Sequence, residues 1–139
     1  MSFKHPKEEQ HACEILWARE KYAVLARSQR TYLRVRNRLK DKAHPDYVAV
    51  QNMIETAKAA PPNPKDAVNA ATHVWGYFKH AATAAEHRTF FDTLHDFKAG
   101  SCDESVLRGH LYRLLSRYPN TYLQESTYFD DVRQPSRDE

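Results

Sequence analysis

The sequence predicts an all-α fold: a single compact domain of about six helices, followed by a short C-terminal helical turn. Apolar residues recur at spacings of three and four residues along most of the chain, which is the period of a helix. Only three glycines occur in 139 residues, which disfavours a fold built on tight β-turns. The length and the 41% content of hydrophobic residues suit one hydrophobic core.

Capping residues and prolines indicate where the helices begin and end. Ser28, Asn63 and Asp103 are typical N-cap residues, and Thr83 with Glu86 has the spacing of a capping box. The helices are expected at about residues 6–26, 28–40, 46–59, 63–81, 83–100 and 103–118, with a short turn at 120–125.

Each expected helix carries a stripe of apolar residues that should face the core. These residues are Ile15, Ala18, Tyr22, Leu25, Tyr32, Val35, Leu39, Tyr47, Val50, Ile54, Ala57, Ala67, Ala71, Val74, Phe78, Ala81, Phe90, Leu94, Phe97, Leu107, Leu111, Leu114 and Tyr118. The last dozen residues are polar, and an extended or disordered tail is expected there. We therefore assign residues 1–129 to the domain and residues 130–139 to a polar tail.

Positive charge is concentrated in one segment, although the whole chain is only mildly basic. The net charge is +3 and the pI is near 8.9. At 100° per residue, Arg30, Arg34 and Arg38 form one stripe opposite the apolar side of the second helix. Such a face suits phosphate groups, because each guanidinium presents a planar fork of donors. A solvated helix face with local pairs, such as Arg38 with Asp41, explains the same pattern.

The cysteines and the N-terminus indicate the compartment. Cys13 and Cys102 are too few for a disulfide framework or an iron–sulfur cluster. The first residues are charged and lack the apolar run of a secretory signal, and no apolar stretch reaches membrane-spanning length. We expect a reduced, cytoplasmic protein with no cofactor and no membrane contact.

Histidines are numerous, but their spacing is not that of a metal site. His73, His80 and His87 recur every seven residues, whereas zinc ligands on a helix usually lie three or four apart. We expect no metal site. No phosphate-binding loop or nucleophile elbow occurs either, so no catalytic residue is predicted. An enzyme would need a site assembled from scattered residues.

Gly76 is expected inside the fourth helix, where glycine costs about 1 kcal/mol relative to alanine. Either close packing of another helix or the approach of a bound ligand explains its presence. Asn69, His73, Tyr77 and His80 share its side of the helix. A ligand pocket near His73 and Tyr77 is therefore open as an alternative.

Four segments resemble the YbgA family, a bacterial domain of unknown function. They are Lys21–Ser28 (KYAVLARS), Asn63–Asp66 (NPKD), His73–Phe78 (HVWGYF) and Tyr118–Leu123 (YPNTYL). The resemblance extends from about His11 to Phe129. Domains of this family occur alone and also fused behind a cysteine-rich domain that resembles thiouracil and thiouridine desulfidases acting on tRNA. The resemblance implies that the helical domain helps to hold RNA while a desulfidase partner performs the chemistry.

The chain departs from the usual family pattern at four positions. Arg27 and Arg113 stand where histidine is usual, Arg36 where glycine is usual, and Ala67 where histidine is common. Three of these changes add positive charge. They favour contact with phosphates over a catalytic role for the histidines.

We therefore expect a non-catalytic RNA-binding accessory domain, with tRNA as its RNA partner. The residues expected to contact RNA are Lys21, Arg27, Arg30, Arg34, Arg38, Lys65, His73, Tyr77, Lys79 and Arg113. One alternative is a protein-interaction module whose arginine face docks an acidic partner. Another is a small enzyme or ligand binder with a pocket near His73 and Tyr77.

Overall fold

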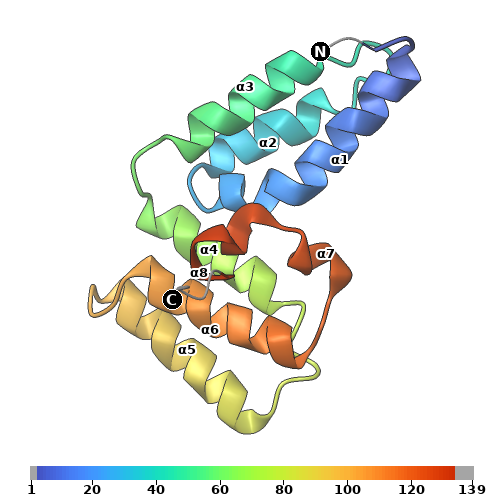
Figure 1. The fold of residues 1–139 in the computed structure, drawn as a ribbon. Coiled ribbons are helices and arrows are strands. Elements are labelled where there is room, and N and C mark those ends of the chain that lie inside the picture. Colours follow the sequence, from blue (N-terminus) through green and yellow to red (C-terminus); the bar gives the residue numbers. More distant parts are fainter. Residues whose placement is uncertain (1–2, 134–139) are drawn as a thin grey trace, which may run out of the picture.

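The structure is a computed structural model that describes residues 3–133. These residues contain eight helices and one 3-10 turn, joined by short loops (Figure 1). The longer helices are α1 (Pro6–Leu25), α2 (Gln29–Arg38), α3 (Tyr47–Lys58), α4 (Pro64–Trp75), α5 (Ala84–Lys98) and α6 (Glu104–Arg117). The short elements are α7 (Thr121–Gln124), the 3-10 turn η1 (Thr127–Phe129) and α8 (Asp130–Arg133). These residues contain no strand, so the predicted all-α fold is confirmed. None of their helices has the length and apolar character needed to cross a membrane.

Most of the expected helix caps are present. The side-chain oxygens of Ser28 and Asn63 accept hydrogen bonds at the first turns of α2 and α4, and Thr83 forms a capping box at α5. Gly100 follows α5 with a φ of +79°, a left-handed conformation that favours glycine. Asp103 lies at the N-cap position of α6, but the expected capping hydrogen bond from its side chain is absent.

The first three helices pack together around a small core at one end of the molecule (Figure 1). Trp17 of α1 packs against Tyr32 of α2, with 5.4 Å between the ring centroids. The expectation that Ile15 faces the core is wrong. The buried stripe of α1 includes Cys13 and Trp17, and a residue two positions after Cys13 lies on the opposite side of a helix. Ile15 is accordingly 48% exposed.

A second, larger core involves α4, α5, α6 and the C-terminal segment. The expected extended tail is wrong for residues 128–133, which belong to η1 and α8. Tyr128 and Phe129 are fully buried, because two large aromatic side chains remove more apolar surface from water in the core than in an extended tail. Residues 134–139 of the predicted tail lie outside the described residues.

The last turn of α1 lies between the two cores. Residues 22–26 are buried in succession, and Val24 packs into the first core while residues on the other side of the helix pack into the second. The carboxylate of Glu20 is buried just before this turn. It pairs with the ammonium of Lys58 at 2.9 Å and accepts a hydrogen bond from the hydroxyl of Thr127 at 2.8 Å. This contact joins α1, α3 and η1.

Asp66 connects the start of α4 to the start of α2. Its buried carboxylate accepts hydrogen bonds from the backbone N–H of Gln29 and from the side-chain amide of Asn63, each at 3.0 Å. Gln29 is the first residue of α2, so the negative charge also lies at the positive end of that helix. The carboxylate therefore helps to position α2.

Helix α4 is shorter than expected. It ends at Trp75, and Gly76 is its exposed C-cap residue. The atoms nearest to a Cβ built on Gly76 belong to the backbone of α4, with the His73 carbonyl oxygen at 3.1 Å. The interpretation that another helix packs closely against Gly76 is therefore wrong. Ala81 lies in the turn after α4 and is exposed, not in the core.

Replacing Asp66 should destabilise the fold. Asp66→Ala leaves the Gln29 N–H without its acceptor, and we expect a loss of about 1–3 kcal/mol in the free energy of unfolding. Asp66→Asn keeps an acceptor oxygen and should cost less. Urea denaturation measures both. Asp92→Ala, an exposed carboxylate on α5, is the control and should change stability by no more than about 0.5 kcal/mol. Equal midpoints for Asp66→Ala and the control would contradict the proposed role.

Candidate nucleic-acid interface

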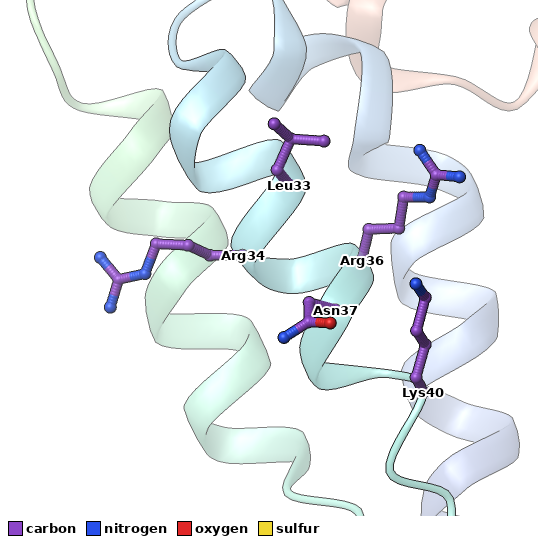
Figure 2. A pocket seen from close by; sticks show the side chains of 5 residues that line it. All are labelled: Leu33, Arg34, Arg36, Asn37 and Lys40. Carbon is purple, nitrogen blue, oxygen red and sulfur yellow. The ribbon is translucent and has the colours of Figure 1, made fainter.

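Three arginines of α2 project into solvent. Arg30, Arg34 and Arg36 are exposed, and no hydrogen bond or ion pair within residues 3–133 holds their guanidinium groups. The helix itself contains no acidic residue. Figure 2 shows that Arg34 extends toward α3, whereas Arg36 extends to the other side of α2, toward α1. The hollow on this face of the helix is lined by Leu33, Arg34, Arg36, Asn37 and Lys40.

Arg38 and Arg27 are held by backbone carbonyl groups. The guanidinium of Arg38 donates to the carbonyl of His44 at 2.6 Å, while Asp41 pairs with the ring of His44 at 3.2 Å. The local pair of Arg38 with Asp41 is therefore not formed. Arg27 donates to the carbonyl of Ala60, just beyond the end of α3, where helix carbonyls lack partners. Both side chains stabilise turns that flank α2 and α3.

Three tyrosines from distant parts of the chain meet beside α1. The phenol oxygens of Tyr22 and Tyr77 are 2.8 Å apart, at hydrogen-bond distance. Tyr77 is nearly parallel to Tyr122, with an interplanar angle of 18°, and the ring of Tyr22 is at 87° to both. The centroid distances are between 6.1 and 6.4 Å. We call Tyr22, Tyr77 and Tyr122 the tyrosine platform.

Lys21 places a positive charge on this platform. Its ammonium nitrogen is 5.3 Å from the ring centroids of both Tyr22 and Tyr122, within the range of a cation–π contact. Burial raises the pKa of Tyr22 and of Tyr122, so both phenols stay protonated at neutral pH. Two of the predicted residues, Lys21 and Tyr77, are thus brought to the same site. Each of them contacts both Tyr22 and Tyr122.

The other predicted contact residues lie elsewhere. Lys65 is in the first turn of α4, His73 is in its last turn, Lys79 follows it, and Arg113 is on α6. All four are exposed. Helix α2 packs against α1 and α3, whereas α4 and α6 contribute to the second core. The ten predicted residues are therefore divided between the face of α2, the platform and separate surface positions.

Sequence reasoning missed Tyr22 and Tyr122 as site residues and omitted Arg36 from the predicted contacts. Tyr22 has the spacing of a core residue and is indeed buried. A signal was nevertheless present, because the three platform tyrosines fall in three of the four segments that carry the family resemblance. Arg36 departs from the family pattern, where glycine is usual at this position.

His110 is a buried histidine of α6, three residues before Arg113. Its Nε2 has no hydrogen-bond partner within the described residues, and its ring lies near Phe90. Burial lowers the pKa of His110, and the positive charge of Arg113 lowers it further, while Glu86 acts in the opposite direction. The folded protein therefore holds this imidazole neutral.

Acid should destabilise the protein through His110. The unfolded chain binds a proton near the ordinary histidine pKa of about 6.5, whereas the folded chain resists it. The stabilisation is present above about pH 6.5 and is lost as the pH falls below that value. We expect the drop in Tm between about pH 7.5 and 5.5 to be larger in the wild type than in His110→Gln. His95→Gln, an exposed histidine of α5, should behave as the wild type. Equal drops in all three proteins would rule out this coupling.

The fold and the site together define a class of protein: an all-helical domain with exposed arginines on α2 and a tyrosine platform beside Lys21. The chain belongs to the family described as Protein of unknown function (DUF1722), whose model matches residues 21–132. YbgA-like proteins are members of this family, which confirms the resemblance. No curated protein and no solved structure matches the chain.

Proposed function

We propose that this domain is a non-catalytic accessory domain that binds RNA, with the arginine face of α2 contacting phosphates. The observation that carries the proposal is the set of three exposed guanidinium groups, Arg30, Arg34 and Arg36, without acidic partners in the described chain. A charge that is already paired gains little from a second anion. Unpaired guanidinium groups gain charge-assisted hydrogen bonds to phosphate and release counterions from RNA.

The two sides of the helix support this proposal. Arg34 and Arg36 extend in opposite directions from α2, so the positive charge covers a broad face instead of one line (Figure 2). Leu33 lies between them and is 47% exposed, which leaves apolar surface available to a sugar or base edge. A phosphate backbone fits such a face better than a single compact anion does.

The resemblance to domains fused behind desulfidase-like enzymes supports extending the proposal to tRNA as the ligand and to a desulfidase-type partner in the cytoplasm. The partner performs the chemistry, and this domain contributes affinity for the RNA. Lys65, Lys79, His73 and Arg113 are exposed and add secondary contacts if the RNA extends over α4 and α6.

Removing the arginine face should weaken RNA binding and its salt dependence. We expect the double variant Arg34→Ala/Arg36→Ala to bind bulk tRNA more weakly in a filter-binding assay at about 50 mM salt. The slope of log affinity against log salt should become shallower by about 1.5, because two phosphate contacts are lost. Arg88→Ala/Lys98→Ala removes two exposed charges from α5 and is the control with the same net charge.

Two results would contradict the proposal. One is the absence of tRNA binding by the wild type at low salt. The other is an equal loss in the control double variant, which would mean that net charge alone is measured. Polyglutamate serves as a competitor: if it displaces tRNA at the same charge concentration, the face docks acidic proteins instead of recognising RNA.

A further inference from the structure

We propose that the tyrosine platform stacks an unpaired nucleobase, so that the RNA is single-stranded or looped where it meets this site. The inference rests on the RNA binding proposed above and adds the class of RNA that is recognised. A face of arginines alone contacts phosphates in any RNA. Aromatic rings that stack on a base require that base to be outside a duplex, and this requirement selects loops, bulges and single strands.

The ring of Tyr77 is the part of the platform that is available for stacking. Tyr77 is 40% exposed, and the centroids of Tyr77 and Tyr122 are 6.2 Å apart although the rings are nearly parallel. Rings that covered each other fully would be separated by about 3.5–4.0 Å, the optimal distance between carbon atoms. The two rings therefore do not overlap fully, and the exposed part of Tyr77 offers aromatic surface to a planar base.

The platform is held in place before any ligand arrives. Tyr22 is buried in the last turn of α1, and its hydroxyl lies 2.8 Å from that of Tyr77. Tyr122 is in α7, next to the fully buried Leu123, and α7 is capped by the side chain of Asn120. Rings that are already ordered lose little conformational entropy when a base binds, which increases affinity.

A phosphate site accompanies the stacking surface. The ammonium of Lys21 lies 5.3 Å from the centroids of Tyr22 and Tyr122, and no acidic side chain within the described residues pairs with it. One nucleotide would place its base on the rings and its phosphate near Lys21. The juxtaposition of a planar aromatic surface and one unpaired cation matches the two parts of a nucleotide.

The platform also continues toward the arginine face. Tyr32 of α2 is partly buried and packs against both cores, the second of which includes Tyr22. Arg36 is four residues after Tyr32 and therefore lies on the same side of α2, and Lys40 extends to that side as well (Figure 2). A strand whose base occupies the platform has successive cations for its neighbouring phosphates. Arg36, absent from the predicted contacts, is therefore a candidate contact for this strand.

The test uses a short single-stranded RNA that carries one 2-aminopurine, whose fluorescence is quenched when the base stacks. Wild-type protein should quench the probe on binding. Tyr77→Leu should abolish the quenching and weaken binding about tenfold, whereas Tyr77→Phe keeps the ring and should still quench. Phe91→Leu, which removes an exposed aromatic ring from α5, is the matched control and should behave as the wild type. Circular dichroism and thermal melting check that each variant is folded.

The outcomes separate this inference from the proposed function. Salt-dependent binding of RNA without quenching, or equal affinity for the single strand and for its duplex, would overturn the base-stacking site and leave phosphate binding intact. Absence of any RNA binding would overturn both. If Tyr77→Leu fails to fold, Lys21→Gln provides the second measurement: it should keep the quenching, lower the affinity and make the salt slope shallower by about 0.7, the value for one phosphate of a single strand.

Discussion

The structure depends on the complete burial of the last turn of α1. Residues 22–26 contact the first core on one side and the second core on the other, so this turn is apolar around most of its circumference. A helix end buried in this way leaves no room for hydrated side chains, and the sequence there is Tyr-Ala-Val-Leu-Ala. The charged residues on either side are half-buried: Lys21 lies over the rings of Tyr22 and Tyr122, and Arg27 donates to the carbonyl of Ala60. The platform and the basic segment both begin at this point.

Polar contacts around the buried turn determine how the two cores are joined. Glu20 is a buried carboxylate that is satisfied by Lys58 and Thr127, so α3 and η1 are held against α1. Asp66 holds the first turn of α2 from the start of α4. Removing either acid would leave the donors that it holds without an acceptor, which would weaken the contacts between these helices. These contacts hold the elements of the first core against those of the second.

The basic segment serves two purposes that composition does not distinguish. Arg27 and Arg38 satisfy the carbonyl groups of Ala60 and His44 and therefore stabilise turns. Arg30, Arg34 and Arg36 have no such partner in the described chain and are available to a ligand. The same residue type is thus structural where an unsatisfied carbonyl lies within reach, and available for binding where none does. The main RNA contacts that we propose are therefore the exposed arginines of α2 and the tyrosine platform.

The sequence by itself determined the helices and most of their boundaries. Helical period, the caps at Ser28, Asn63 and Thr83, and the glycine after α5 act over a few residues, so their effect is visible locally. The burial of the C-terminal aromatic residues depends on distant packing, which local patterns do not reveal. The apolar spacing through Ala81 predicts a longer α4, but the helix ends just before Gly76, a residue type that is common at helix ends. The tyrosine platform was decided only by the tertiary structure. Tyr22, Tyr77 and Tyr122 belong to three different segments, and only the packing around the last turn of α1 brings their rings together.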